Sequence, residues 1–146
     1  MIKRVLVPLD KSEAAEEILP LITMLAKGDA TIHLLHVAPV PETVMALDGR
    51  VIAYSDQVSA SAEAAWADYV ALLKAHAGIE VEDALRFGDP ATEILAEAEA
   101  CGADTIALST AAACSLKRAL VGSVTETILR RAPVGVLLYR PTQAVR

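Results

Sequence analysis

Short runs of apolar residues alternate along the chain with longer stretches in which apolar residues recur every three or four positions. The first pattern is typical of strands buried on both faces, and the second is typical of helices that bury one face. Apolar runs of the first kind lie at residues 5–10, 31–37, 79–87, 105–108 and 133–139. Helical spacing lies between them, so strands and helices are expected to alternate through the chain.

Turn and capping residues give approximate limits to these elements. A helix is predicted from Ser12 to Gly28, with a kink or break at Pro20, because proline cannot donate the helical hydrogen bond. Asp89 followed by Pro90 predicts the N-cap and first residue of another helix. Residues 38–56 have no clean period and predict a long irregular loop. The remaining helices are expected at 58–77 and from Gly122 onward.

Five strands that alternate with four helical segments predict an α/β fold. We expect an open five-stranded parallel sheet with helices on both faces, joined by right-handed crossovers. The run at 79–87 alternates only in part, which indicates an edge strand. With 146 residues and neither a repeat nor a linker, the chain is expected to form a single domain over residues 1–146.

The amino-acid composition excludes some classes of binding partner. Thirteen basic and nineteen acidic residues give a net charge of −6, which argues against binding to nucleic acid or to anionic membranes. No apolar run approaches the roughly 18 residues of a spanning helix, and the apolar part of the N-terminus is too short for a signal peptide. Cys101 and Cys114 do not make a disulfide framework. A cytoplasmic location is expected.

In open parallel sheets, ligands bind outside the carboxyl ends of the strands, where the strand order reverses. Asp10 follows the first strand, where its carboxylate would accept hydrogen bonds from a ribose or an adenine amine; alternatively, Asp10 or Ser12 only caps the first helix. The segment 122–125 begins a helix whose free N–H groups favour an anion. The alternative there is an ordinary capping box of Ser123 with Glu126.

Other candidate residues have structural interpretations. His33 and His36 are three apart on one strand and point to opposite faces, so no shared metal site is expected. Trp66 and Tyr69, at helical spacing, are interpreted as core or interface residues. Cys114 is interpreted as a small loop residue rather than a reactive thiol. No catalytic residue is predicted.

Several motifs, in this order and at this spacing, resemble the universal stress protein family. They cover nearly the whole chain and comprise 5–12 (VLVPLDKS), 34–37 (LLHV), 87–91 (FGDPA), 116–125 (LKRALVGSVT) and 132–137 (APVGVL). The resemblance implies a Rossmann-like sheet of the adenine nucleotide alpha hydrolase type with strand order 3-2-1-4-5. It also implies a small cytosolic stress-response regulatory protein that binds ATP or AMP, with magnesium.

Nucleotide-binding members of the family carry two glycines after the fourth strand, three positions apart. Those positions are Ser109 and Ala112 here, while nine residues still separate Ala112 from Gly122. Glycine adopts a positive φ without strain, whereas another residue there costs about 1–2 kcal/mol. If both positions need that geometry, the loss lowers nucleotide affinity by about two to three decades.

The predicted nucleotide-binding residues combine the strand ends, the altered loop and the last helix start. They are Pro8, Leu9, Asp10, Val37, Leu108, Ser109, Ala112, Gly122, Ser123, Val124 and Thr125. A homodimer is expected to form through the last strand, because edge strands pair readily with another chain. The alternatives are a dimeric interaction module without nucleotide, and a weak ATPase in which Asp10 is the best-placed carboxylate.

Overall fold

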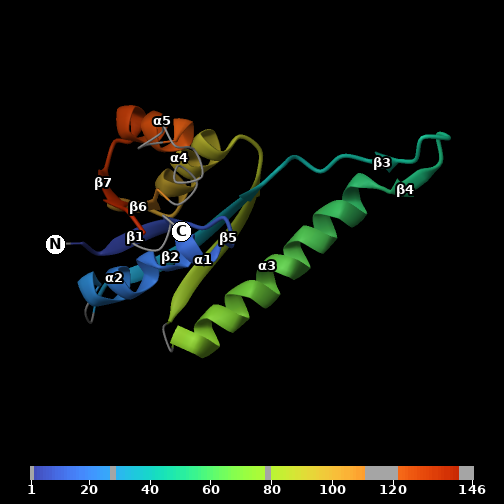
Figure 1. Cartoon of the computed structure of the whole chain (residues 1–146). Coiled ribbons are helices and arrows are strands. Elements are labelled where there is room, and N and C mark those ends of the chain that lie inside the picture. Colours follow the sequence, from blue (N-terminus) through green and yellow to red (C-terminus); the bar gives the residue numbers. More distant parts are fainter. Residues whose placement is uncertain (1, 27–28, 78–79, 111–121, 142–146) are drawn as a thin grey trace.

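The central sheet has five parallel strands (Figure 1). The computed structural model describes residues 2–26, 29–77, 80–110 and 122–141. The strands are β1 (Arg4–Pro8), β2 (Thr31–Ala38), β5 (Val81–Phe87), β6 (Thr105–Ser109) and β7 (Gly135–Tyr139). Their order is β5-β2-β1-β6-β7, which confirms the order 3-2-1-4-5 when these five strands are counted along the chain. β5 is an edge strand, as its partial alternation predicted.

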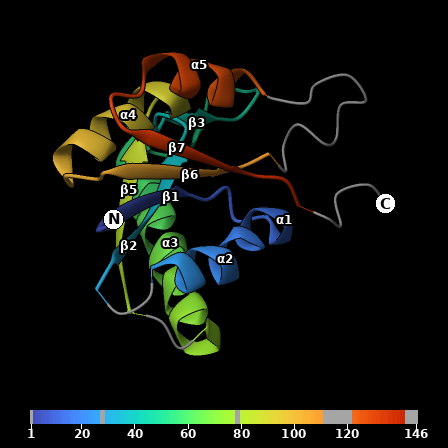
Figure 2. The same ribbon diagram turned by 90° about the vertical axis from the view of Figure 1, so that its left-hand side faces the viewer.

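Helices cover both faces of the sheet, as predicted (Figure 2). One face carries α1 (Glu13–Glu16), α2 (Ile18–Leu25) and α3 (Ser55–Ala77). The other face carries α4 (Pro90–Ala100) and α5 (Ser123–Arg131). Asp89 caps α4, where its side chain accepts a hydrogen bond from the Thr92 amide, and Pro90 is the first helical residue. The predicted start of this helix is therefore confirmed.

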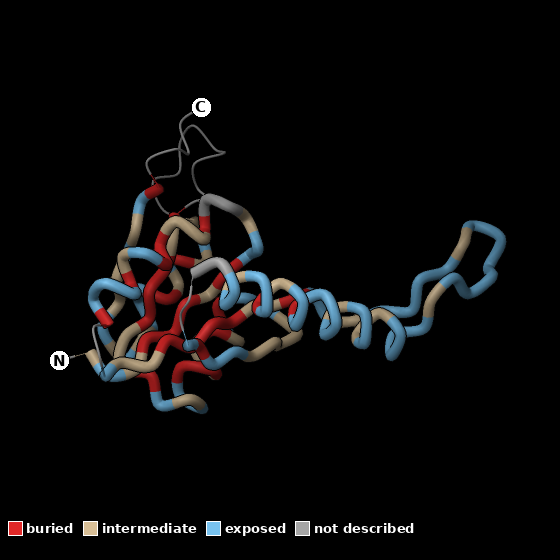
Figure 3. The backbone as a smooth tube through the Cα atoms, turned by 90° about the horizontal axis from the view of Figure 1, so that it is seen from below, coloured by how far each residue is buried: buried red, intermediate tan, exposed pale blue. Residues whose placement is uncertain are grey.

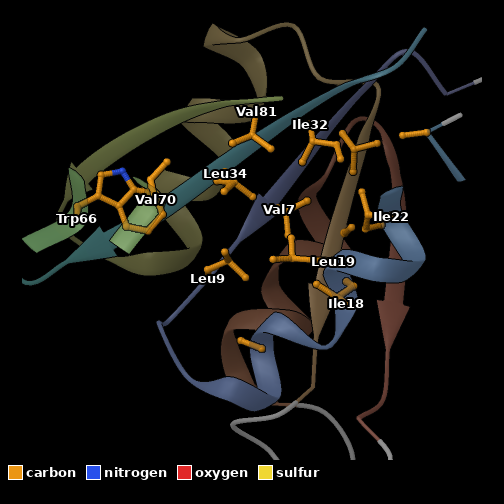
Figure 4. Packing of buried hydrophobic residues seen from close by; sticks show 14 residues of the cluster. Val7, Leu9, Ile18, Leu19, Ile22, Ile32, Leu34, Trp66, Val70 and Val81 are labelled. Carbon is orange, nitrogen blue, oxygen red and sulfur yellow. The ribbon is translucent and has the colours of Figure 1, made fainter. Parts of the chain in front are cut away.

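Two apolar cores lie on the two faces of the sheet. Strand side chains alternate between the faces, so Val5 and Val7 of β1 enter one core while Leu6 enters the other. In the first core, β-strand residues pack against α1, α2 and α3 (Figure 4). In the second core, Leu6 and its neighbours pack against α4 and against Ile128 of α5. Small and branched aliphatic side chains thus fill both layers.

The predicted interruption at Pro20 is a break between two helices. α1 ends at Glu16, and α2 begins at Ile18. Pro20 has no N–H to donate to the carbonyl of Glu16, and its ring crowds that carbonyl. The chain therefore starts a new helix rather than continuing the first. α2 ends at Leu25, and the predicted stop at Gly28 lies outside the described residues.

The interpretation of residues 38–56 as an irregular loop is wrong in part. They contain a two-stranded antiparallel sheet of β3 (Val44–Met45) and β4 (Val51–Ala53), closed by a turn in which Gly49 has a φ of 85°. Strands of two and three residues are too short to show a period in the sequence. This arm extends away from the sheet, and the arm and the beginning of α3 are mostly exposed (Figure 3).

α3 connects the arm to the core through its aromatic residues. Trp66 is 3% exposed, and its indole N–H donates to Asp83 of β5 at 3.0 Å. The Tyr69 hydroxyl donates to Glu16 of α1 at 2.6 Å, and burial, followed by this hydrogen bond, raises the pKa of Tyr69. The prediction of a core role for both residues is confirmed. Within the described residues, no helix is both long enough and apolar enough to cross a membrane.

Candidate functional site

A cleft of about 400 Å³ lies at the carboxyl ends of β1, β2 and β6. From β1, the next two strands along the chain, β2 and β5, are added on one side of the sheet. The last two strands, β6 and β7, are added on the other side, so the strand order reverses between β1 and β6. Parallel sheets form ligand crevices at this point, because the loops after the two strands leave in opposite directions. The start of α5 forms one wall of the same cleft.

The cleft brings together most of the residues predicted from the sequence. Those that line it are Pro8, Leu9, Asp10, Val37, Leu108, Ser109, Gly122, Ser123, Val124 and Thr125. Ala112 and Cys114 lie outside the described residues. Four separate segments of the chain therefore converge on one cleft, as the strand-end rule predicted.

The turn after β1 positions the Asp10 carboxylate at the cleft. Lys11 has a φ of 67°, which reverses the chain sharply between the strand and α1. The side chain of Ser12 accepts a hydrogen bond from the Ala15 amide at 3.1 Å, so Ser12 is the N-cap of α1. Asp10 Oδ1 accepts hydrogen bonds from the Ser12 amide at 2.9 Å and the Ser12 hydroxyl at 2.6 Å.

Asp10 therefore supports the cap without being the cap. Its side chain is exposed, and no hydrogen bond to its second oxygen, Oδ2, is found among the described residues. One carboxylate oxygen thus fixes the turn, while the other is available to a ligand. The structural and the ligand-binding interpretations of Asp10 are compatible, because they use different oxygen atoms.

The start of α5 differs from the capping box considered above. Gly122 is the N-cap, and no side chain caps the helix. Ser123 is the first helical residue, and the Glu126 carboxylate pairs with Arg130 at 2.7 Å. The expected capping box of Ser123 with Glu126 is therefore wrong. The amides of the first turn have no partner within the helix and carry the positive end of its dipole, which favours an anion.

Ser109 does not have the positive φ that would make the loss of a glycine costly at this position. It is the last residue of β6 and is paired with Tyr139 of β7. Among the described non-glycine residues, only Lys11 has a positive φ. The strain expected from replacing glycine therefore does not arise at Ser109 in this structure.

Six lining residues were missed by the sequence analysis: Ala15, Leu35, His36, Pro90, Ile94 and Thr110. The strand-end rule that selected Val37 and Ser109 could also have selected His36 and Thr110, which are their neighbours in sequence. Pro90 and Ile94 come from α4, and only the packing of that helix on β2 brings them to the cleft. No local signal in the sequence indicates such a contribution.

His36 is held firmly at the cleft. Its Nδ1 donates to the Leu9 carbonyl at 2.8 Å, and its ring stacks on Trp66 with centroids 5.7 Å apart. His33 lies on the opposite face, where its ring contacts Glu97 of α4. The predicted placement of the two histidines on opposite faces is confirmed.

The described lining is mainly apolar, and its polar groups include the Asp10 carboxylate and the hydroxyls of Ser123 and Thr125. Asp10 is the one carboxylate among the described lining residues, and none of these residues is Lys or Arg. The positive potential in this part of the cleft therefore comes from the dipole and free amides of α5 rather than from a cationic side chain. The arrangement suits a ligand with an apolar body, hydroxyl groups and an anionic end.

Comparison with known proteins now identifies the family. The model of the universal stress protein family matches residues 1–140. The chain belongs to the universal stress protein family. Its resemblance to this family in sequence motifs is thus confirmed over almost its whole length. No curated protein sequence matches the chain.

Solved structures of the universal stress protein fold superpose on the chain. The hypothetical protein MJ0577 is 26% identical, with a TM-score of 0.77, and the match covers 98% of this chain and 99% of that one. UspA from Lactobacillus plantarum is 23% identical, with a TM-score of 0.72 and coverages of 95% and 98%. A universal stress protein in complex with cAMP is 18% identical, with a TM-score of 0.66 and coverages of 95% and 97%.

Proposed function

We propose that this universal stress protein is a cytoplasmic stress-response regulator whose cleft binds an adenine nucleotide, ATP or AMP. The observation that carries the proposal is the uncapped start of α5, which shares one cleft with the Asp10 carboxylate at the reversal point of the sheet. A nucleotide needs an apolar surface for its base, an acceptor for its ribose hydroxyls and an anion site for its phosphates, and the lining of this cleft contains groups of all three kinds.

Each part of the cleft has a role in this proposal. The first-turn amides of α5, with the hydroxyls of Ser123 and Thr125, bind the phosphates. Val37 and the apolar strand ends pack against the base, and Asp10 Oδ2 accepts from the ribose hydroxyls. Magnesium prefers carboxylate and phosphate oxygens, so Asp10 is the described lining residue whose chemistry suits that ion. Adenine nucleotide as the ligand class is supported by the relative crystallised with cAMP.

Calorimetry with ATP, AMP and cAMP, each with and without magnesium, tests the proposal. We expect ATP or AMP to bind, and Asp10→Asn to weaken binding about tenfold, because it removes the charge at Oδ2 while its amide oxygen still accepts from Ser12. Asp48→Asn is the matched control on the exposed arm, and it should bind as the wild type does. Absence of heat from the wild type at about 1 mM nucleotide would refute nucleotide binding.

We also propose that the protein is a homodimer paired through β7. β7 is an edge strand of the sheet and is only partly buried, with Leu138 38% exposed. An edge strand presents unpaired backbone groups that a second copy can satisfy. This surface also favours the alternative function, a dimeric interaction module without nucleotide.

Light scattering after size exclusion measures the dimer directly. The wild type should have about twice the chain mass of 15.4 kDa, and Leu138→Lys should shift it toward the monomer, because lysine on an edge strand opposes strand pairing. Leu129→Lys, on an exposed position of α5, is the control and should stay dimeric. A wild type that remains at the monomer mass at high concentration contradicts the proposal.

A further inference from the structure

Three metal-ligating side chains meet between the sheet and α4. They are His33 of β2 and Glu97 and Cys101 of α4 and its C-cap. The ring nitrogen Nε2 of His33 lies 2.8 Å from Glu97 Oε1, and the three ligand atoms lie within 4.8 Å of one another. None of the three lines the nucleotide cleft. The cluster is therefore a separate feature of the fold.

The secondary structure brings His33, Glu97 and Cys101 together. Glu97 and Cys101 are four residues apart, so they lie on the same side of α4, one turn from each other. His33 lies two residues before Leu35 on β2, and alternation places both on the face that α4 covers. His33 is 7% exposed and Glu97 8% exposed, while Cys101 is partly exposed. Two ligands are thus buried, and the third lies at the solvent side.

The His33 ring lies between two carboxylates. Nδ1 lies 3.2 Å from Glu82 Oε2, and Nε2 lies 2.8 Å from Glu97 Oε1. A neutral imidazole has one N–H and one lone pair, so it can donate to only one of two carboxylates. The other nitrogen then directs its lone pair at an oxygen. A proton or a metal ion between Nε2 and Glu97 removes that repulsion.

The surrounding charges orient the ligands as in a metal site. Arg86 Nε donates to Glu97 Oε2 at 2.5 Å, which leaves Oε1 turned toward His33. Glu82 accepts from the far nitrogen of His33 and also pairs with Arg4. A carboxylate on the second nitrogen of a metal-bound histidine fixes the tautomer and strengthens the ligand. Both buried ligands therefore have a supporting partner.

We propose that His33 Nε2, Glu97 Oε1 and Cys101 Sγ bind a divalent transition metal of the Zn²⁺ class. A nitrogen, an oxygen and a thiolate sulfur are the donors that zinc takes, and such ligand atoms stand about 3.3–3.6 Å apart in a tetrahedral site. The ligand atoms here are separated by 2.8 Å between His33 Nε2 and Glu97 Oε1 and by no more than 4.8 Å for any pair. Small rotations of the side chains would therefore bring them to tetrahedral spacing. Three protein ligands leave one position of a tetrahedral zinc ion for water.

Binding at this site exchanges protons for the metal. Burial raises the pKa of the Cys101 thiol, and the metal binds the thiolate and the Nε2 lone pair of His33. The thiol proton and a proton held between Nε2 and Glu97 therefore both leave to solvent as the metal enters. Arg4, Glu97 and His33 are the ionisable groups around this thiol.

Titration with Co²⁺ as a spectroscopic probe tests the site. The full chain is used without a histidine tag and with Cys114→Ser, so that Cys101 is its one thiol. We expect one equivalent of Co²⁺ to give a thiolate-to-cobalt charge-transfer band and the visible bands of a tetrahedral ion, and Zn²⁺ to displace it. If neither band forms, the position between His33 and Glu97 holds a proton only, and the proposal is wrong.

Matched variants separate ligation from folding. In the chain that keeps Cys114, Cys101→Ser should abolish the charge-transfer band, and Glu97→Gln should weaken Co²⁺ binding about tenfold or more. Glu99→Gln, at an exposed position of the same helix, should bind Co²⁺ as the parent does. Cys101 is partly exposed, so its serine variant decides the question even if changes at buried His33 unfold the chain. A charge-transfer band that survives in Cys101→Ser with Cys114 present, or an unchanged Co²⁺ affinity in Glu97→Gln, overturns the assignment.

Discussion

Ser123→Glu is expected to lower the affinity for ATP or AMP by about fivefold to a thousandfold without lowering the free energy of unfolding. Ser123 is the exposed first residue of α5 at the cleft. A carboxylate about 4 Å from a phosphate costs about 1–4 kcal/mol at the effective dielectric constants of water and protein surfaces. The same carboxylate stabilises the helix start by about 0.3–1 kcal/mol. The effects on binding and on folding therefore have opposite signs.

Calorimetry and urea unfolding measure these two effects in one protein. Ser55→Glu is the matched control, because it places the same charge at the first residue of α3, another helix start, outside the cleft lining. It should leave nucleotide affinity unchanged. Equal affinities of Ser123→Glu and the wild type would show that the phosphates do not bind at the start of α5.

Ile128→Ala should lower the free energy of unfolding by about 2–5 kcal/mol. Ile128 is fully buried and packs in the core that joins α5 and α4 to the sheet. Removing three carbon atoms there leaves a cavity that the surrounding side chains fill only in part. Because total stability of a domain is about 5–15 kcal/mol, this is a large share of it. α5 also carries the anion site, so a loosened helix should weaken nucleotide binding as well.

Leu129→Ala is the neighbouring control for this core prediction. Leu129 is 45% exposed, so its truncation should cost less than about 1 kcal/mol. Urea midpoints of both variants give the comparison, provided that the slope of each transition stays that of the wild type. Similar losses in the two variants would contradict the burial of Ile128 in the core.

Sequence reasoning predicted most of the sheet and much of the cleft. Apolar runs located the five parallel strands, because a strand buried on both faces is apolar throughout. The break before Pro20 and the cap at Asp89 followed from local chemistry, since both depend on neighbouring residues alone. The arm of β3 and β4 was missed, because its strands are too short for a period.

The site was predictable only where it follows strand ends. Asp10 and Val37 reach the cleft because they end neighbouring strands, and the topology brings such ends together. The cap of α5 was mispredicted, because Ser123 and Gly122 are both good N-caps and backbone geometry decides between them. The absence of a metal site was expected because His33 and His36 were compared only with each other. The neighbours of His33 in the proposed site, Glu97 and Cys101, belong to α4 and its C-cap, and Glu97 lies 64 residues further along the chain.

The sequence by itself determined the alternation of strands and helices, and its motifs already pointed to the universal stress protein family, because periodicity and local capping act over a few residues. The tertiary structure decided which chemical groups meet. It placed Asp10 and the start of α5 in one cleft, and it enclosed His33 between two carboxylates. Which side chains become neighbours depends on how the helices pack on the sheet. This packing is determined by the whole molecule rather than by any one segment.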